Sequence, residues 1–324
     1  MTFSAQLPHR YRNDPFARDV AEGLMGSPKR LSSKYFYDET GDALFQAIMA
    51  LPEYYLTRCE YDILSRYAAD FLAGYAPDRH FYLVELGAGD GLKTRLLLRH
   101  LIEGGYDFTY APVDISANAL RKLSEALAGE WPALKLLPIE ADYFTALKSP
   151  AFGSEAPRLA LFLGSNIGNY LPHEALSFYQ ALHAALRPGD RVLTGFDLQK
   201  NPHLILAAYN DAQGVTRNFN LNLLRRINQA FDGNFELHNF SHYPVYEPET
   251  GLAKSYLVSE RAAEVHLAAL GLTIHFAAGE WIFTEVSRKF TPDNVEALAL
   301  DAGFRPLLMR HDDQRYFADA LWER

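Results

Sequence analysis

The 324-residue chain has little of what marks several classes of protein. Its single cysteine, Cys59, excludes an internal disulfide and any metal site built from several cysteines, and fits a reducing cytosol. With 31 basic against 40 acidic residues the net charge is −9, so the chain lacks the excess of Lys and Arg that nucleic acids and anionic membranes reward. We therefore expect neither of these as a partner.

Long apolar runs are also missing. No run approaches the ~20 residues of a membrane span, and the N-terminus lacks a basic segment followed by an apolar one. We expect a cytoplasmic protein that works as a monomer. His238 and His242 stand four residues apart, but Pro244 and several aromatics interrupt the segment and no helical Glu accompanies the pair. We therefore expect no metal.

What the chain does contain is a strand, a glycine turn and a helix start in one run. Residues 81–86 are apolar and fit a buried parallel strand, and residues 94–102 have helical periodicity. Between them Gly87, Gly89 and Gly91 allow a tight turn and a close approach to a ligand. This pattern indicates a nucleotide-like cofactor, with a tight turn that holds no ligand as the alternative.

The residue after the third glycine helps to choose the cofactor. A dinucleotide fingerprint has the spacing Gly-x-Gly-x-x-Gly, and Leu92 stands where its last glycine would be. The spacing from Glu85 to Gly91 is instead Glu-x-Gly-x-Gly-x-Gly, which resembles motif I of the class I S-adenosylmethionine-dependent methyltransferases. That cofactor has no phosphate, so the packing glycine of the dinucleotide fingerprint is not required. Leu92 thus disfavours a nicotinamide oxidoreductase.

Two acids follow at positions that suit the polar groups of such a cofactor. Asp114 ends a second apolar run, where doubly wound folds present a carboxylate to ribose hydroxyls. Asp142 follows a third run and precedes Tyr143, and in class I methyltransferases such a pair meets the adenine. Each acid alone could be a surface carboxylate or a helix cap.

Apolar strands and amphipathic helices alternate over residues 61–198, as an α/β fold with a doubly wound sheet requires. The chain ends with a helix capped by Thr291, which runs to Gly303, and a hairpin over residues 304–309 and 316–322. A closing antiparallel hairpin matches the Rossmann-like sheet of class I methyltransferases. The expected parallel strands are 81–86, 109–115, 135–139, 159–164 and 191–197.

Two segments rich in aromatics lie outside this alternation. Residues 1–60 precede the core, and residues 199–288 interrupt it between its fifth strand and its last helix. We expect them to form an inserted α+β substrate-binding domain, a lid over the carboxyl ends of the strands. Residues 61–198 and 289–324 would then form the cofactor-binding domain.

Five motifs, in lid and core alike, resemble those of the histidine-specific Nα-methyltransferases of ergothioneine biosynthesis. Their order and spacing are kept over nearly the whole chain. The resemblance implies S-adenosylmethionine as cofactor and three methylations of the α-nitrogen of L-histidine, giving the betaine hercynine. The motifs are KYFYD (34–38), LPEYYLTR (51–58), FLGSNIGN (162–169), AYNDAQGVT (208–216) and TEVSRKF (284–290).

The resemblance also implies a role for individual residues that would bind the amino acid. Asn169 and Tyr209 would hold its carboxylate, with an amide and a phenol as neutral donors. Tyr37 would lie beside the amine and, with Asn169, help to remove its protons. The other substrate contacts would be Tyr54 in the pocket wall, the backbone of Gly164, and Glu285 with Ser287 as the pair that reads the imidazole.

On the cofactor, Gly87 and Gly89 would approach the amino-acid moiety and Lys93 would lie near its carboxylate. Asp114 would bind the ribose, and Asp142 with Tyr143 the adenine. Glu85 belongs to the same motif and is included in the predicted cofactor site.

One departure keeps the substrate open. Ser255 stands at a substrate-binding position where related sequences carry a larger apolar residue, and related enzymes act on tryptophan derivatives. Glu285 favours imidazole, because an indole offers only one donor to a buried carboxylate. The alternatives are an Nα-methyltransferase of another amino acid, such as a tryptophan derivative, and a catalytically silent partner protein that binds S-adenosylmethionine.

Overall fold

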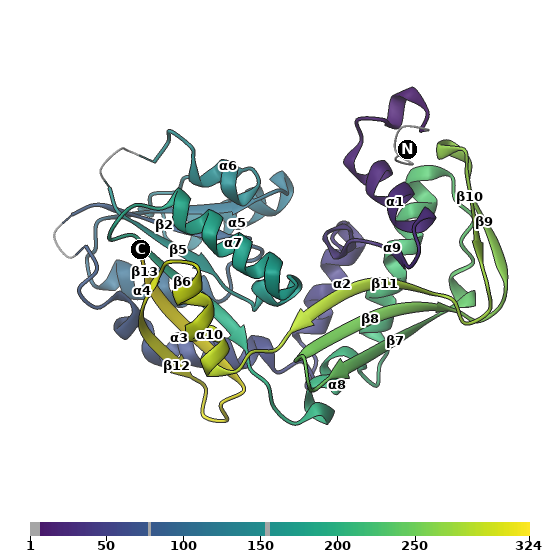
Figure 1. Cartoon of the computed structure of the whole chain (residues 1–324). Coiled ribbons are helices and arrows are strands. Elements are labelled where there is room, and N and C mark those ends of the chain that lie inside the picture. Colours follow the sequence, from purple (N-terminus) through teal and green to yellow (C-terminus); the bar gives the residue numbers. More distant parts are fainter. Residues whose placement is uncertain (1–6, 77–78, 153–155) are drawn as a thin grey trace. The chain divides into compact units, whose positions relative to one another are not determined.

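The computed structural model describes residues 7–76, 79–152 and 156–324. It divides into two compact units, which are described separately (Figure 1). Unit 1 comprises Met1–Tyr55 and Lys200–Ser287, and unit 2 comprises Leu56–Gln199 and Arg288–Arg324. Within the described residues, no helix is both long enough and apolar enough to cross a membrane.

Unit 2 is built on a seven-stranded sheet with the order β12-β13-β6-β5-β2-β3-β4. Strands β2 to β6 are parallel, whereas β13 pairs antiparallel with both β6 and β12. This topology confirms the predicted Rossmann-like sheet with its closing hairpin. The strands are β2 (Phe81–Leu86), β3 (Phe108–Asp114), β4 (Ile139–Glu140), β5 (Arg158–Phe162), β6 (Arg191–Asp197), β12 (Arg305–His311) and β13 (Phe317–Glu323).

One expected strand is much shorter than predicted. Over residues 135–139 only Ile139 belongs to β4, and an isolated bridge between Leu136 and Tyr110 is all that precedes it. Pro138 stands in between and has no N–H for the ladder, and β4 is an edge strand, which the sheet can shorten with little loss.

Helices cover both faces of this sheet, as a doubly wound fold requires. Helices α3 and α4 pack together on one face, and α7 packs with α6 and α10 on the other (Figure 1). The helices of unit 2 are α3 (Leu56–Leu72), α4 (Thr94–Glu103), α5 (Ala117–Glu130), α6 (Tyr143–Leu147), α7 (Pro172–Ala185) and α10 (Pro292–Asp301), with a 3₁₀ turn, η4 (Asn166–Asn169).

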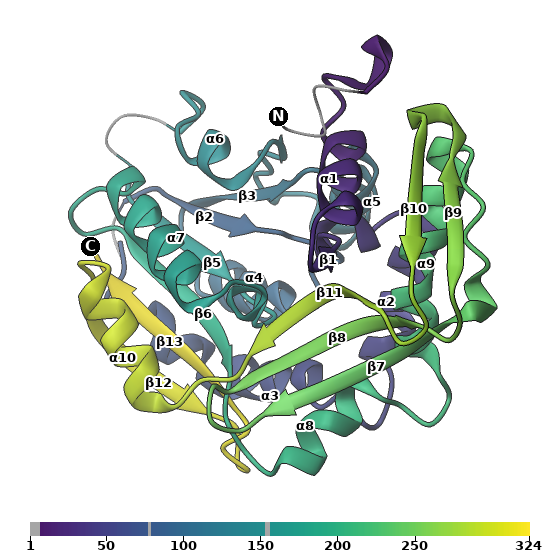
Figure 2. The ribbon, with the colours of Figure 1, turned by 45° about the vertical axis from the view of Figure 1, so that its right-hand side comes forward.

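Unit 1 is an α+β unit whose four-stranded sheet has the order β1-β11-β8-β7 (Figure 2). A separate two-stranded sheet pairs β9 with β10. The strands are β1 (Lys29–Arg30), β7 (Phe240–Glu247), β8 (Leu252–Ser259), β9 (Ala263–Leu267), β10 (Leu272–Phe276) and β11 (Trp281–Arg288). The helices are α1 (Pro15–Met25), α2 (Glu39–Met49), α8 (Pro202–Tyr209) and α9 (Val215–Phe231), with 3₁₀ turns η2 (His9–Tyr11), η3 (Ser33–Phe36), η5 (Leu237–Asn239) and η6 (Ala268–Leu270).

Helix α9 organises the core of unit 1. Its buried Phe219, Leu223 and Ile227 recur at helical spacing and pack against the sheet. The Asp211 carboxylate caps the helix, because it accepts hydrogen bonds from the backbone N–H groups of Val215 and Thr216 at 2.9 and 2.8 Å.

A buried ion pair fixes the point where the chain re-enters unit 2. Lys289 Nζ lies 2.8 Å from Asp197 Oδ2, and both side chains are fully buried. The backbone N–H of Asp197 donates to Ser165 Oγ at 3.0 Å. The pair therefore links the carboxyl end of β6 to the segment that leads into α10.

We expect Lys289→Met to lower the free energy of unfolding by about 3–5 kcal/mol, because it leaves the buried Asp197 carboxylate without its counter-charge. The double variant Lys289→Met/Asp197→Leu removes both charges and should recover most of that loss. Urea denaturation of both variants checks this. A single variant as stable as the unmodified chain would contradict it.

Candidate functional site

The glycine turn after β2 has the left-handed backbone that the sequence predicted. The φ angles of Gly87, Gly89 and Gly91 are +80°, +52° and +64°. A Cβ on Gly87 would lie 3.0 Å from Tyr143 Oη, and one on Gly91 would lie 2.7 Å from Leu123 Cδ1. A Cβ on Gly89 would meet no atom of another described residue, apart from its chain neighbours, within 4 Å. The space beside Gly89 is therefore open to a ligand.

Glu85, just before the turn, is almost fully buried. Its carboxylate accepts hydrogen bonds from the hydroxyls of Thr94 and Tyr110. Since Thr94 is the first residue of α4, Glu85 ties the end of β2 to the start of that helix. Burial raises the pKa of Glu85 to about 7, although the two hydroxyls and Lys93 oppose the rise. The observed contacts of Glu85 thus shape the turn.

Lys93 lies between the turn and α4, and its ammonium group reaches the carboxyl end of β5. A Cβ on Gly164 would lie 3.2 Å from Lys93 Nζ. Lys93 forms an ion pair with Glu60 of α3, and the backbone N–H of Gly164 donates to the two oxygens of Glu60 at 2.8 and 2.9 Å. The Gly164 N–H is therefore already bonded to Glu60. The predicted backbone contact of Gly164 with a substrate would then use the carbonyl oxygen of Gly164.

Asn166 was missed by the sequence analysis. Its amide lies 3.7 Å from the positions that a Cβ would take on Gly87 and on Gly164, so it sits between the ends of β2 and β5. Its place directly after a buried parallel strand was an available signal. Glu60 was also missed, and no local pattern in α3 marks it.

The two predicted acids lie at the same edge of the sheet. Asp114 ends β3, and its Oδ1 accepts from the backbone N–H of Ser116 at 2.9 Å. Burial raises the pKa of Tyr143 above its usual value, and Tyr170 and then Asp114 add to the rise. A Cβ on Gly87 would lie 3.0 Å from Tyr143 Oη, and the Gly87 N–H donates at 2.9 Å to the carbonyl of Val113, the residue before Asp114. The structure thus brings Gly87, Asp114 and Tyr143 together.

Asp142 caps α6. Its Oδ1 accepts from the backbone N–H groups of Phe144 and Thr145, both at 3.0 Å, and Oδ2 accepts from the Thr145 hydroxyl. The Thr145 hydroxyl is the main cause of the lowered pKa of Asp142, so the carboxylate is charged. Each carboxylate oxygen has two lone pairs, so the cap leaves capacity to accept from a ligand.

Asn169 is exposed at the end of η4 and does not serve as the cap of the next helix. Helix α7 has Leu171 as its N-cap, and Glu174 Oε2 accepts from the Leu171 N–H at 2.8 Å. Asn169 therefore does not cap α7.

In unit 1, Tyr37 and Tyr54 belong to one aromatic cluster. The Phe45 ring lies 5.6 Å from the Tyr37 ring and 6.3 Å from the Tyr54 ring, centre to centre, with edge-on geometry. Phe219 of α9 lies 5.7 Å from Tyr37. Arg226 Nη1 donates to the Tyr37 carbonyl at 3.1 Å, which fixes the backbone there. The Tyr37 side chain itself is 43% exposed.

Glu285 and Ser287 project from the same face of β11, because side chains alternate along a strand. Thr284 points the other way, and its Oγ1 lies 2.8 Å from Asn220 Oδ1 of α9 and 3.0 Å from the Ser255 carbonyl oxygen. These contacts anchor β11 beside β8 and α9. Glu285 and Ser287, the residues predicted to bind the imidazole, therefore lie on a strand that is anchored to its neighbours.

Four buried polar atoms of this unit have no hydrogen-bond partner among the described residues. Two of them lie on neighbouring strands, Ser255 Oγ on β8 and His242 Nε2 on β7, and the others are Glu53 Oε2 and Thr216 Oγ1. Burial lowers the pKa of His242 to about 4, so its ring is neutral. Tyr209, which ends α8, is also buried, and α8 packs on β7 and β8. An unpaired buried polar atom costs stability, and such atoms mark places where a ligand or water can bond.

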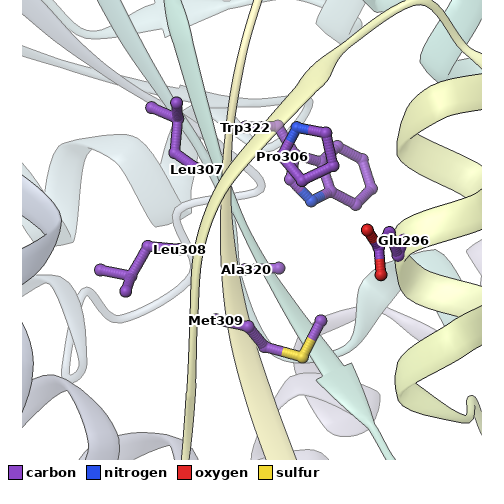
Figure 3. Close-up of a pocket in the computed structure, with 7 residues that line it drawn as sticks. All are labelled: Glu296, Pro306, Leu307, Leu308, Met309, Ala320 and Trp322. Atoms are coloured by element: carbon purple, nitrogen blue, oxygen red, sulfur yellow. The ribbon is translucent and has the colours of Figure 1, made fainter.

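Unit 2 has a pocket between α10 and the closing hairpin (Figure 3). Its walls are mostly apolar, and Glu296 is the one ionisable side chain among them. None of the predicted site residues lines it. The lining residues are Glu296, Pro306, Leu307, Leu308, Met309, Ala320 and Trp322.

The predicted site residues thus form two sets, one in each unit. The described residues contain no group of three or more His, Cys, Asp or Glu arranged to hold a metal ion. Unit 2 carries Glu85, Gly87, Gly89, Lys93, Asp114, Asp142, Tyr143, Gly164 and Asn169, and unit 1 carries Tyr37, Tyr54, Tyr209, Ser255, Glu285 and Ser287.

Comparison with known proteins gives consistent matches. The model of a family described as histidine-specific, SAM-dependent methyltransferases matches residues 16–324. The chain is 40% identical over 289 residues to the histidine N-alpha-methyltransferase of Mycolicibacterium smegmatis, which covers 89% of this chain and 88% of that protein. It is 36% identical over 304 residues to the enzyme of the same name from Mycobacterium tuberculosis, covering 94% and 93%. Ergothioneine biosynthesis protein 1 of Schizosaccharomyces pombe is 32% identical over 254 residues, covering 75% of this chain and 33% of that protein.

The raised pKa of Glu85 predicts how stability depends on pH. Folding raises this pKa from 4.5 to about 7, so the folded chain binds the proton more tightly than the unfolded chain. The resulting stabilisation is complete when the pH is below the pKa of Glu85 in the unfolded chain. It is lost as the pH rises through the pKa of Glu85 in the folded chain. Relative to Glu85→Gln, which cannot ionise, the unmodified chain should lose about 3 kcal/mol of unfolding free energy across this range.

Urea denaturation of both proteins at several pH values measures this difference. Parallel stability profiles for the unmodified chain and Glu85→Gln would show that the carboxyl group does not titrate in that range.

Proposed function

The chain belongs to the family of S-adenosylmethionine-dependent, histidine-specific methyltransferases, and from this premise we propose that it methylates the α-amino nitrogen of L-histidine. The product of three transfers is the betaine hercynine, an intermediate of ergothioneine biosynthesis. The observation that carries the proposal is the arrangement of the glycine turn, Lys93, Asp114 and Tyr143 at one edge of the unit 2 sheet. We also propose that the enzyme works as a cytoplasmic monomer, in keeping with its net charge of −9 and single cysteine.

The residues at this edge fit the cofactor group by group. The open space beside Gly89 admits a ligand against the backbone. The Lys93 ammonium would bind the cofactor's carboxylate, and Asp114 would accept hydrogen bonds from the ribose hydroxyls. Asp142 would accept from the adenine amino group, and Tyr143 would cover the ring. When bound, S-adenosylmethionine supplies an electrophilic methyl carbon on its sulfonium sulfur.

The residues of unit 1 suit a histidine side chain. The Glu285 carboxylate would accept from one imidazole N–H, and the Ser287 hydroxyl would engage the other ring nitrogen. A side chain that cannot make both bonds would leave a buried polar group unpaired, which costs about 1–3 kcal/mol. This pair is therefore the proposed source of specificity for imidazole.

The substrate's backbone groups need donors and acceptors of their own. Tyr209 and Asn169 would donate hydrogen bonds to the carboxylate, and the Gly164 carbonyl would accept from the amine. Tyr54 would form part of the pocket wall. The buried hydroxyl of Ser255 offers a further polar contact at this substrate-binding position.

The reaction itself needs little acid–base chemistry. The α-nitrogen must lose its ammonium proton, after which its lone pair forms the new N–C bond while the departing sulfur keeps the electrons of the broken C–S bond. Tyr37, with Asn169, would help to carry the protons away from the amine. Most of the rate enhancement would come from alignment and from the exclusion of water.

The first expectation is turnover of histidine. Purified protein incubated with S-adenosylmethionine and histidine should yield products heavier by one, two and three methylene units, detected by mass spectrometry. A panel that includes tryptophan and its derivatives serves as the comparison. No methylated histidine at all would contradict the proposal, and turnover of another amino acid alone would favour the changed substrate.

The second expectation concerns Glu285. We expect Glu285→Ala to raise the KM for histidine by about 100-fold, because the imidazole N–H loses its acceptor, while the affinity for S-adenosylmethionine changes by less than about twofold. Steady-state kinetics and calorimetry measure the two effects. An equal loss of both would show that Glu285 serves only to hold β11 in place.

A further inference from the structure

A cluster of charged side chains lies buried in unit 2 beneath the predicted cofactor site, and none of the roles assigned above includes its two acids. Glu60 of α3 and Asp319 of β13 are both completely buried. The two acids come from segments far apart in the sequence. Glu60 forms an ion pair with Lys93, which is itself distant in the sequence from both acids. Burying two acids beside one lysine needs a physical reason.

Several groups from different elements of unit 2 lie close to the Glu60 carboxylate. Glu60 accepts from the backbone N–H of Gly164 with both oxygens and from the ammonium of Lys93. Gly195 of β6 lies directly beneath it, since a Cβ there would overlap Glu60 Oε1. Gly195 in turn pairs in register with Asp319 on the neighbouring strand. Four elements of unit 2 therefore converge on one carboxylate.

The Glu60 carboxylate lies beside Asp319, because Asp319 pairs with Gly195 and a Cβ on Gly195 would overlap Glu60 Oε1. Both oxygens of Asp319 are buried, and no donor among the described residues reaches either of them. Two ionised carboxylates cannot hydrogen-bond each other, but a protonated one can donate to its neighbour. Burial and the nearby charge of Glu60 raise the pKa of Asp319 well above its usual value, while Lys93 acts in the opposite direction. The proton therefore belongs on Asp319.

We propose that Asp319 donates a hydrogen bond to Glu60, and that this carboxyl pair positions Lys93 and Gly164 for binding the amino-acid moiety of the cofactor. The inference rests on the proposed function for the identity of that cofactor. Glu60 and Asp319 are positioning residues, which touch neither cofactor nor substrate. With one proton shared by the two acids, the cluster holds one negative charge against one positive charge, which is the least costly state for a buried site.

The positioning role follows from what Lys93 would do without the pair. A lysine has three donors and a flexible stem, so one bond to Glu60 limits where the ammonium group lies and leaves donors for a ligand. The same carboxylate holds the end of β5 through Gly164. Loss of Glu60 would release both groups at once, and the loss should affect a ligand only through its amino-acid moiety.

The test compares two ligands by calorimetry. S-adenosylhomocysteine carries the amino-acid moiety, and 5′-methylthioadenosine lacks it. We expect Glu60→Ala to weaken the binding of S-adenosylhomocysteine at least about tenfold and to change the binding of methylthioadenosine by less than about twofold. Asp62→Ala is the matched control, because Asp62 lies on the same helix in an exposed pair with Arg66.

Conservative variants keep the test decisive if Glu60→Ala folds poorly. In Asp319→Asn the amide can donate to Glu60 as the protonated acid does, so both affinities and the melting temperature should match those of the unmodified chain. Asp319→Leu removes the donor and should weaken S-adenosylhomocysteine binding selectively. In Glu60→Gln the amide oxygen still accepts but the charge is lost, so the selective loss should be smaller than in Glu60→Ala.

Three results would overturn the inference. Equal loss of both ligands in the Glu60 variants would mean that these residues only stabilise the fold. Tighter binding of S-adenosylhomocysteine would mean that Glu60 competes with the ligand for Lys93. A failure of Asp319→Asn to match the unmodified chain would mean that Asp319 is not the proton donor. If the unmodified chain binds neither ligand, the proposed cofactor fails and the inference fails with it, whereas binding without turnover of histidine leaves the inference standing.

Discussion

Unit 2 depends on a buried carboxylate that must be neutralised from inside the protein. Glu60 has no access to water, so the chain itself has to supply its partners. The Gly164 N–H and the Lys93 ammonium do so. Because these partners come from the end of a parallel strand and the start of a helix, satisfying one charge fixes the edge of the sheet where the predicted cofactor residues lie. Gly195 is glycine because a side chain there would displace the carboxylate.

The same edge is shaped by backbone conformation. Three left-handed glycines turn the chain sharply after β2, and Glu85 ties this turn to the first residue of α4. Gly87 and Gly91 are held against neighbouring side chains, whereas Gly89 faces open space. The turn is thus held by side chains at two glycines and accessible at the third, which leaves room for a ligand against the backbone. In unit 1, the predicted substrate residues Glu285 and Ser287 lie on a strand anchored to α9 through Thr284.

The sequence predicted most of the sheet because its strands are continuous apolar runs: residues 81–86 and 191–197 form β2 and β6 with the expected bounds. It failed at 135–139, where a proline on an edge strand outweighs apolar composition. Glu60 and Asp319 could not be found as a group, because their contacts join segments far apart in the chain and no local spacing encodes them. The roles of Tyr37, Glu285 and Ser287 came from the resemblance alone, and they remain predictions.

The central claim is that the methyl group goes to the α-nitrogen of histidine and not to its ring. Nuclear magnetic resonance of the product formed from ¹³C-methyl S-adenosylmethionine and histidine labelled with ¹⁵N only at the α-amino group measures this directly. The account predicts that the transferred carbon shows one-bond coupling to the labelled α-nitrogen. A labelled methyl group without that coupling, on a ring nitrogen or on another atom, would contradict it.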